Sequence, residues 1–546
     1  GWWFAGEKLL IALPLLLPPA AGAALVTLPH LLSTRRRSSP WTEFFPLVAA
    51  YGAVAGVVAG VAVGYPLSGP PAIVLVLAVA GGAVATWSIR ARKGPPGRAW
   101  RIAGAVVTAA ALAWTGLSMW NSRPTTIRLA AGPAVAAVQQ TSTRVRHFDL
   151  TARKATITLA SGRRVEALTF NGVTPGPPIR VRQGDTVEVT LRNELQDRGV
   201  TLHWHGYRVP NAMDGVPGLT QDAVGPGGSF VYRFVADQPG TYWYHTHETP
   251  NLALQQGLFG TFTVDPAPPH GLDEPLPIHT YQGTLTIAGV DGISRRTVRP
   301  GTPVRLRVIN TDNTPHTVGM SVPYAIKAVD GTDIGGPPTT GRVELAAGGR
   351  YDLAFTMPGQ PALLSAGRAG TGLVLTPGSR AVPEEPAGPI VDITRYGTRD
   401  VTPPARFDRE DTWVLDRLIA LRNGLPLLSH TVNGQVWPHV PPTVVRNGDW
   451  VRVTVVNRSG DHHPMHPHGH RVLVLERDGE ATLPTWMDSF DVAPGEVWVV
   501  ALHADNPGVW LAHCHELTHA AEGMTLHLAY EGAGTPYALD EHNHPE

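Results

Sequence analysis

A chain of 546 residues is too long for one ordinary domain, and its 59 glycines and 51 prolines favour turns and short strands over long helices. Nine of the 44 Lys and Arg residues but only two of the 44 Asp and Glu residues lie in 1–121, so the rest carries a net charge of −7, which excludes the nucleic-acid binders that rely on a basic surface. The one cysteine, Cys514, excludes disulfides within the chain.

Four apolar stretches fill the first 121 residues, each close to the roughly 20 residues that a membrane-spanning helix needs. They are Leu9–Leu32, Phe44–Tyr65, Ala72–Ile89 and Ile102–Trp120. Basic residues gather in two of the loops between them, Arg35–Arg37 and Arg90–Arg101, and the positive-inside rule places these loops in the cytoplasm. The sequence therefore predicts an α-helical region of about four spans in the cell membrane, with the lipid bilayer as a partner and everything after residue 121 on the extracytoplasmic side.

The first apolar stretch leaves an alternative open, because Pro14, Pro18 and Pro19 interrupt it. It is a kinked span, a re-entrant segment or a signal-like remnant, and three spans would remain if it lies in the membrane interface. No Asp or Glu occurs between Glu43 and Asp149, so nothing in these stretches suggests an ion path, and the expected role of the region is anchoring. A polar linker is expected at residues 122–143.

The remainder contains one sequence unit three times. Each copy runs from a glycine to an asparagine nine positions later, and apolar and polar residues alternate between them, as in a half-buried strand. The pairs are Gly184 and Asn193, Gly301 and Asn310, and Gly448 and Asn457. A second element, a Pro-Gly pair with a histidine 19 positions after the proline, occurs in the first copy at Pro226 and in the last at Pro494.

This repeat predicts a mainly β fold of three β-sandwich domains. The expected ranges are 144–268, 275–380 and 388–533, followed by a polar tail at 534–546. The first and third domains carry the histidine clusters described next, whereas the middle domain is expected to be structural. His542 and His544 of the tail are expected to have no role.

Ten histidines fall into four clusters. The clusters are His203 and His205, then His245 and His247, then His463, His466 and His468, and finally His513, His515 and His519. Residues i and i+2 of a strand share a face while residue i+1 points away, so each His-x-His pair offers two imidazoles in one direction. Cys514 lies between His513 and His515 and must face the other way, which predicts two metal sites on opposite faces of one strand.

The Cys514 face has His463 and His519 available as nitrogen ligands and Met524 as a cap. Two His, one Cys thiolate and a weak axial Met form a blue-copper electron-transfer site. The other face offers eight imidazoles, which alone would suit copper, zinc, iron or nickel, but the adjoining blue-copper pattern favours copper. His470 and His316 are expected to pack or to form hydrogen bonds behind the ligands.

At these residues the sequence resembles the three-domain multicopper oxidases, a family that includes laccases, ascorbate oxidase, bilirubin oxidase and bacterial cuprous oxidases. The resemblance rests on four motifs, HWHG at His203–Gly206, HTH at His245–His247, HPMHPHG at His463–Gly469 and HCHELTHAAEGM at His513–Met524. It covers residues 144–533 and leaves the apolar first quarter outside.

The resemblance implies a Greek-key cupredoxin fold for each domain, and one type 1, one type 2 and two type 3 coppers per chain. It assigns the type 1 copper to His463, Cys514, His519 and Met524, and the type 2 copper to His203 and His466. It assigns one type 3 copper to His205, His245 and His515, and the other to His247, His468 and His513. The implied activity is a laccase-like oxidase in which single electrons enter at type 1 copper and pass through Cys514 to the three-copper cluster, where dioxygen becomes water.

Reduction of dioxygen consumes protons, so an acid is expected near the cluster. Asp214, nine residues past His205, stands where family members with this motif place an acidic proton donor, although Asp214-Gly215 is also a strong turn dipeptide. Some bacterial members carry a second acid directly after the last type 1 histidine, but Ala520 holds that position here. Glu516 and Glu522 are the remaining candidates.

The sequence defines the reductant less closely. Only seven methionines occur and no Met-rich insert precedes the last cluster, which argues against a dedicated cuprous-ion funnel and favours phenols and aromatic amines. Oxidation of cuprous or ferrous ions for metal tolerance is the alternative.

Other functions fit the histidine pattern less well. A copper nitrite reductase would lack the four histidine pairs, and an electron carrier or copper-storage module would need only the type 1 ligands. No haem or quinone signature supports membrane quinols as donors, and the oligomeric state is open.

Overall fold

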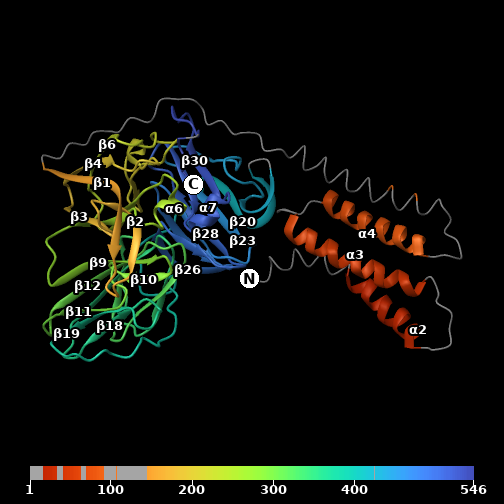
Figure 1. Ribbon diagram of the computed structural model, residues 1–546, viewed down its shortest axis with the longest axis horizontal. Coiled ribbons are helices and arrows are strands. Elements are labelled where there is room, and N and C mark those ends of the chain that lie inside the picture. Colours follow the sequence, from red (N-terminus) through yellow and green to blue (C-terminus); the bar gives the residue numbers. More distant parts are fainter. Residues whose placement is uncertain are drawn as a thin grey trace. The chain divides into compact units, whose positions relative to one another are not determined.

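The computed structural model describes residues 16–32, 41–62, 69–90, 102, 106, 144–422, 425–540 and 542–545. Its described N-terminal part is helical, and strands begin at Val145 (Figure 1). Two compact units are distinguished: one holds residues 1–126 with 414–439 and 457–460, and the other holds the remaining chain.

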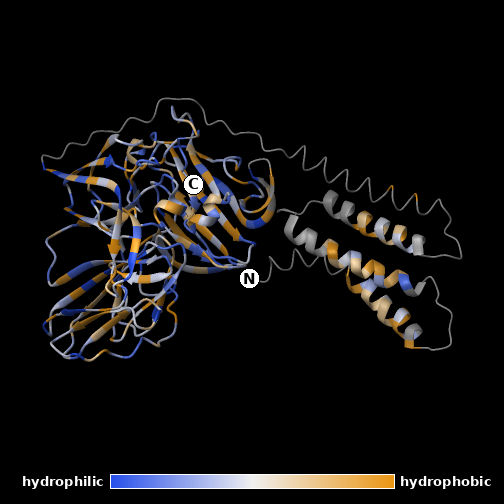
Figure 2. Cartoon of the chain, viewed as in Figure 1, coloured by the Kyte–Doolittle hydropathy of each residue, from blue (hydrophilic) through white to orange (hydrophobic). Residues whose placement is uncertain are grey.

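Two long helices account for most of the described N-terminal part. A π-helical turn, η1 (Ala23–Thr27), continues into α2 (Leu28–Leu32), and α3 (Trp41–Ala62) is followed by α4 (Gly69–Arg90). Helices α3 and α4 pack together, because Tyr51 Oη lies 2.8 Å from Thr86 Oγ1 and Ala55 meets Val79 in a small apolar core. Hydrophobic residues predominate on the coloured parts of these helices (Figure 2).

These helices correspond to part of the predicted membrane region. The predicted stretches Phe44–Tyr65 and Ala72–Ile89 fall on α3 and α4, and the first stretch is helical from residue 16. The fourth stretch and the linker 122–143 lie outside the described residues, apart from Ile102 and Val106. In the ranges that the structure describes, we find no helix with both the length and the apolar character that crossing a membrane requires. The spans therefore remain a prediction from the sequence.

From Val145 onward the fold is mainly β, and the first repeat copy contributes strands β1 to β8. Their bounds are β1 (Val145–Thr158), β2 (Arg164–Phe170), β3 (Gly176–Arg182), β4 (Thr186–Asn193), β5 (His203–His205), β6 (Ser229–Val235), β7 (Gly240–His245) and β8 (Phe259–Asp265), with short helices η2 (Asn211–Met213) and α6 (Pro250–Ala253). The sheets run in the orders β2-β1-β4-β6 and β3-β8-β7-β5. Buried side chains of both sheets, such as Val189 and Phe262, share one core, so this copy is a sandwich.

The second copy contributes β9 to β19. Their bounds are β9 (Leu272–Tyr281), β10 (Thr284–Ile287), β11 (Ile293–Thr297), β12 (Pro303–Asn310), β13 (His316–Met320), β14 (Ala325–Val329), β15 (Thr332–Asp333), β16 (Arg342–Leu345), β17 (Arg350–Thr356), β18 (Ala362–Ser365) and β19 (Gly372–Thr376). The sheets run β10-β9-β12-β17-β14-β15 and β11-β19-β18-β13-β16. Strand β9 begins three residues before the predicted start of this domain at 275.

The third copy contributes β20 to β30. Their bounds are β20 (Arg409–Arg422), β21 (Leu425–Val432), β22 (Thr443–Val445), β23 (Trp450–Asn457), β24 (His463–Pro467), β25 (Val472–Arg477), β26 (Glu480–Met487), β27 (Phe490–Val492), β28 (Val497–His503), β29 (Val509–Cys514) and β30 (Thr525–Tyr530), with helix α7 (Leu517–Ala521). One sheet contains the run β23-β28-β25-β26, and the other has the order β22-β30-β29-β24-β27. Strands β20 and β21 form a hairpin with Leu415 opposite Val432.

The repeated glycine and asparagine have the same structural role in each copy. Gly184, Gly301 and Gly448 have φ of 89°, 80° and 93°, a left-handed conformation that favours glycine, at the turn before β4, β12 and β23. The asparagine that ends each strand accepts a hydrogen bond from the main-chain N two residues later, at 2.9, 2.9 and 2.8 Å. The sequence repeat therefore marks the two ends of one strand in each sandwich.

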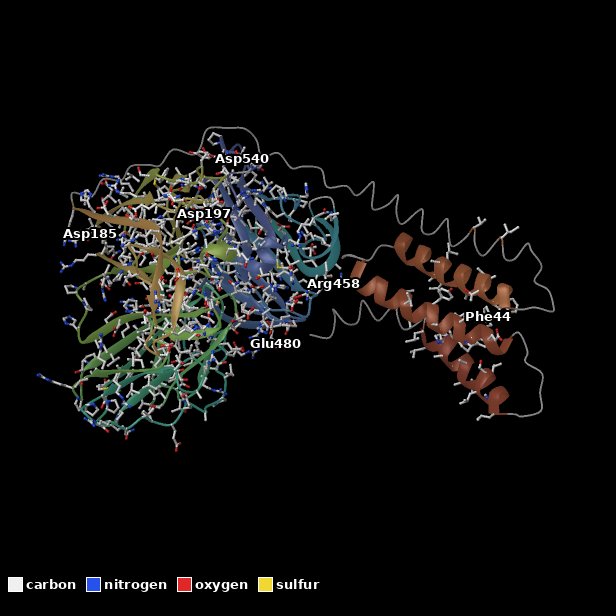
Figure 3. The ribbon with its side chains drawn as sticks, viewed as in Figure 1. Phe44, Asp185, Asp197, Arg458, Glu480 and Asp540 are labelled. Carbon is white, nitrogen blue, oxygen red and sulfur yellow. The ribbon has the colours of Figure 1, made fainter. Side chains whose placement is uncertain are left out.

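The predicted polar tail packs against the first copy (Figure 3, where Asp540 marks the tail). The Asn543 side chain is buried, and its Oδ1 accepts a hydrogen bond from Ala223 N at 2.9 Å. The main chain of His544 donates to Glu248 Oε2 at 2.9 Å and accepts from Thr249 N at 2.7 Å. His544 therefore contributes through its backbone, a role that its side-chain chemistry does not indicate.

Candidate metal centre

Four strands bring the predicted ligands together. Strand β5 pairs with β7, which places His203 opposite His245, and β24 pairs with β29, which places His466 opposite His513. The two strand pairs come from the first and third copies, and their histidines meet: His203 Nε2 lies 3.4 Å from His466 Nε2. The site is therefore shared between two repeat copies, with ligands from each.

The histidine cluster consists of eight buried imidazoles, His203, His205, His245, His247, His466, His468, His513 and His515. Within it, several sets of described residues have their ligand atoms within 4.8 Å of one another. They include His203 with His466 and His468, His203 with His205 and His245, and His247 with His468 and His513. Nitrogens so close together, with no water-facing surface, form the kind of ligand set that holds more than one metal ion.

Main-chain oxygens orient four of these eight rings. Nδ1 of His203, His245, His466 and His513 points to the main-chain oxygen of Asp214, Thr246, Asp488 and Cys514 at 3.0, 2.8, 2.6 and 3.1 Å. An imidazole that donates Nδ1–H to a carbonyl has its Nε2 free as a metal ligand. His205 has the reverse arrangement, because its Nε2 lies 2.9 Å from Ser489 Oγ and its Nδ1 has no hydrogen-bond partner among the described residues.

Burial disfavours the charged form of several cluster imidazoles. It lowers the pKa of His205, His245, His247 and His515 well below the usual range, and the neighbouring imidazoles lower it further. Neutral imidazole is the form that binds metals. Among the described residues, Nε2 of His245 and both ring nitrogens of His247 and His515 are buried without a hydrogen-bond partner, a costly state that a bound metal ion would relieve. The donor set therefore fits copper.

The opposite face of β29 carries the second group. Cys514 Sγ lies 3.7 Å from His463 Nδ1 and 3.7 Å from His519 Nδ1, and all three groups can reach a single ion. Met524 is buried, and its main-chain oxygen accepts a hydrogen bond from Cys514 N at 3.1 Å. His519 is partly exposed, and its Nε2 lies 2.8 Å from Glu516 Oε2. A thiolate with two imidazoles is the ligand set of a blue-copper site.

Asp214 lies beside the histidine cluster in a fully buried position. Its Oδ2 accepts a hydrogen bond from His468 Nδ1 at 2.9 Å, and its Oδ1 lies 3.2 Å from His203 Nδ1. Burial raises the pKa of this carboxyl, and the neighbouring His203 opposes that effect. The structure therefore places Asp214 directly behind two histidines of the cluster, His203 and His468.

The other acids and histidines named from the sequence lie elsewhere. Glu516 contacts His519 on the Cys514 side, so it is not placed to serve the histidine cluster. His470 is buried and bonds to His468 O at 2.9 Å and to Tyr530 Oη at 2.7 Å. His316 Nε2 lies 2.8 Å from Asp312 Oδ2 in the second copy. Both histidines form hydrogen bonds and neither belongs to a predicted ligand set, as expected.

A buried ionic group from the second copy reaches the cluster and was missed by the sequence reasoning. Arg350 of β17 has no exposed surface and forms a bidentate ion pair with Asp488, through Nη1 to Oδ1 and through Nη2 to Oδ2 at 2.7 Å. Asp330 accepts hydrogen bonds from the main-chain N of Arg350 at 2.9 Å and of Asp488 and Ser489 at 3.1 Å each.

This ionic group orients two cluster ligands. Asp488 holds the His466 ring through its main-chain oxygen, and Ser489 Oγ holds the His205 ring. The second copy also offers Gly348 O to Trp243 Nε1 at 3.2 Å, and a side chain at Gly348 would collide with His205. The second copy supplies no ligand among its described residues, in line with the structural role expected of it, but Arg350, Asp330 and Gly348 help to position His205 and His466.

Comparisons with known proteins agree with this geometry. Two family profiles, both described as multicopper oxidase, match residues 151–269 and 403–533. Laccase-1 of Botryotinia fuckeliana is 28% identical over 454 residues, which is 67% of this chain and 79% of that protein. The multicopper oxidase MmcO of Mycobacterium tuberculosis is 28% identical over 478 residues, 73% of this chain and 90% of that protein. The crystal structure of a multi-copper oxidase from Pseudomonas thermotolerans superposes with a TM-score of 0.59 at 27% identity and covers 71% of this chain and 99% of that one.

Replacing Arg350 should selectively weaken copper binding by the histidine cluster. Arg350→Gln leaves Asp330 and Asp488 as buried carboxylates without their cation, and loss of one partner of a buried ion pair typically costs about 3–5 kcal/mol. We expect less copper per chain, with loss from the histidine cluster, while the copper beside Cys514 and its blue absorption remain. Copper analysis and optical spectra would measure this.

Two further variants make this test specific. Arg305→Gln removes the pairing of the partly exposed Arg305 with Asp352 in the same sheet and should leave the copper content unchanged. Asp330→Asn keeps the shape of the side chain that accepts hydrogen bonds from the main chain of Arg350 and Asp488. It tests the same ionic group if Arg350→Gln fails to fold. Full copper occupancy in folded Arg350→Gln protein would contradict the positioning role.

Proposed function

The chain is a multicopper oxidase, an oxidoreductase with dioxygen as acceptor, and we propose that its reductants are phenols and aromatic amines, as in laccases. One observation supports this coupling: strand β29 and the residue after it place Cys514 on one face and His513 and His515 on the other. Bound copper would supply the chemistry, taking single electrons beside Cys514 and giving four to dioxygen at the histidine cluster. The peptide bonds on either side of Cys514 join the two sites.

The proposal assigns each ligand as the family resemblance implies. His463, Cys514, His519 and Met524 would hold the type 1 copper, and His203 and His466 the type 2 copper. His205, His245 and His515 would hold one type 3 copper, and His247, His468 and His513 the other. The grouping of His247, His468 and His513 within 4.8 Å supports the last of these sets, and the approach of His203 Nε2 to His466 Nε2 supports the type 2 set.

Competing functions within the same fold fit less well. A copper nitrite reductase does not need four histidine pairs, and an electron carrier or copper-storage module needs only the ligands around Cys514. Eight buried imidazoles beside that site would then have no purpose, although burying them with several ring nitrogens left without a hydrogen-bond partner is costly.

One observation favours the alternative reductant, a cuprous or ferrous ion. His519 is the partly exposed imidazole of the Cys514 group, and the carboxylate of Glu516 lies against its outer nitrogen at 2.8 Å. A carboxylate at the edge where a reductant docks attracts metal cations. Parallel kinetics with a neutral phenol, an aromatic amine, Fe(II) and Cu(I) would decide between the two classes.

We also propose that residues 1–121 anchor the oxidase in the cell membrane, with the copper domains on the extracytoplasmic side. The support is the sequence alone: four apolar stretches without acids after Glu43, and basic residues confined to two of their loops. The protein should remain in the membrane pellet after an alkaline carbonate wash, and a variant that begins at residue 122 should not. Release of the full chain by the wash would contradict anchoring.

Replacing Cys514 tests the proposed function directly. Cys514→Ser removes the thiolate, so the blue absorption and the oxidation of a phenol should both be lost, while the copper of the histidine cluster stays bound. Oxygen uptake together with a copper count per chain would measure both effects. Retained oxidase activity in this variant would overturn the proposed path, and one copper per wild-type chain would overturn the cluster.

Asp214 is proposed as the proton donor to dioxygen reduction. Asp214→Asn keeps an oxygen that can accept the His468 Nδ1 hydrogen bond but cannot deliver a proton, so kcat should fall by roughly 10²-fold or more. Reduction of the blue site by the phenol in the absence of dioxygen should keep its wild-type rate in stopped-flow measurements. If kcat stays within twofold of wild type, Asp214 is a turn residue only.

A further inference from the structure

A cavity lies apart from the ligands of both copper groups. It has a volume of about 170 Å³ and lies between the loop after β5 and the ends of β23, β26 and β28. Its walls include two tryptophans, Trp450 and Trp486, and two arginines, Arg208 and Arg471. No residue of the Cys514 group lines it, so it is not the place where a reductant would contact His519.

Aromatic rings form one side of this cavity. Trp450 and His503 are cross-strand neighbours in β23 and β28, and their rings stack with centroids 4.5 Å apart and planes at 20°. The Trp486 ring lies 6.3 Å from that of Trp450. Neither indole N–H has a hydrogen-bond partner among the described residues. The half-buried rings therefore offer flat apolar surfaces and free donors to a small planar molecule.

The charge of the cavity favours an anion. Arg208 Nη1 binds Asp505 Oδ2 at 2.9 Å, and His503 Nδ1 lies 3.3 Å from the same oxygen, so the one carboxylate of the cavity is already paired. Arg471 lies 5.6 Å from the centre of the Trp486 ring and donates one hydrogen bond, to Thr332 Oγ1 at 2.9 Å. No carboxylate of the described chain pairs with Arg471, which leaves most of its five donors available.

Size and chemistry together define the ligand class. A volume of about 170 Å³ is well below the roughly 300 Å³ at which drug-sized pockets begin, so the cavity suits a single ring. A guanidinium resting on an aromatic face presents a planar fork of N–H groups that matches a carboxylate. We propose that this cavity binds a single-ring aromatic carboxylate, with the carboxylate on Arg471 and the ring against Trp450 and Trp486.

The floor of the cavity adjoins the histidine cluster. Gly206 directly follows His205, and His470 bonds to the main-chain oxygen of His468. A side chain at Gly206 would collide with Arg350 and Asp488, the ion pair behind the cluster. An occupant therefore lies behind the cluster ligands and away from His519, so its binding should lower kcat without competing with the reductant.

Benzoate tests this proposal because it has the ring and the carboxylate but no hydroxyl to oxidise. Isothermal titration of the full-length copper-loaded protein should show one benzoate per chain, and Arg471→Gln should weaken binding at least tenfold. Trp486→Leu, which removes the flat surface, should also weaken it and serves if Arg471→Gln does not fold. Benzylamine and acetate, which lack the carboxylate and the ring respectively, should bind at least tenfold more weakly than benzoate.

Arg477→Gln is the matched control. Arg477 lies 5.5 Å from the centre of the Trp498 ring, as Arg471 does over Trp486, but it is paired with Glu496 and lines a different cavity. Its replacement should leave benzoate affinity unchanged. Three results would each overturn the proposal: no binding of benzoate to the wild type, affinity that Arg471→Gln and Trp486→Leu leave unchanged, or inhibition that raises only the KM of the reductant.

Discussion

The alternation of side chains along β29 is the constraint on which the rest of the site depends. Successive residues of a strand point to opposite faces, so Cys514 faces His463 and His519 while His513 faces His468. No other element has to bridge the two ligand groups, because one peptide bond separates Cys514 from each neighbouring histidine. The neighbouring strands complete this arrangement. Strand β24 lies beside β29 and supplies His463 and His466, with His468 directly after it, and β5 and β7 close the cluster from the first copy.

Burial makes the cluster suitable for binding metal, but it also costs folding free energy. Eight imidazoles without water lose their hydration, which is why the pKa of most of them falls and why several ring nitrogens lack partners. The fold offsets part of this cost with backbone carbonyls that fix the rings. The second copy adds the Asp330, Arg350 and Asp488 group, whose Asp488 and Ser489 hold His466 and His205. A domain without ligands thus shares in forming the metal centre.

Local patterns made much of this predictable. The nine-residue spacing of glycine and asparagine identifies strands β4, β12 and β23, because a left-handed turn and an asparagine at the strand end are local requirements. The His-x-His spacing and the position of Cys514 predict which ligands face each other. The sequence could not reveal Arg350 beside Asp488, since the two are 138 residues apart and each alone resembles an ordinary charged residue. The same holds for Asn543, whose partner Ala223 lies 320 positions earlier in a segment without a recognisable signal.

Anomalous diffraction at the copper absorption edge, from crystals of the copper-loaded protein, tests the central claim most directly. The account predicts one peak beside Cys514 Sγ, between His463 and His519, and a separate group of peaks among the eight histidines on the other face of β29. Copper on only one face, or a peak that is not bounded by these side chains, would contradict the claim that β29 carries ligands of two copper sites on its opposite faces.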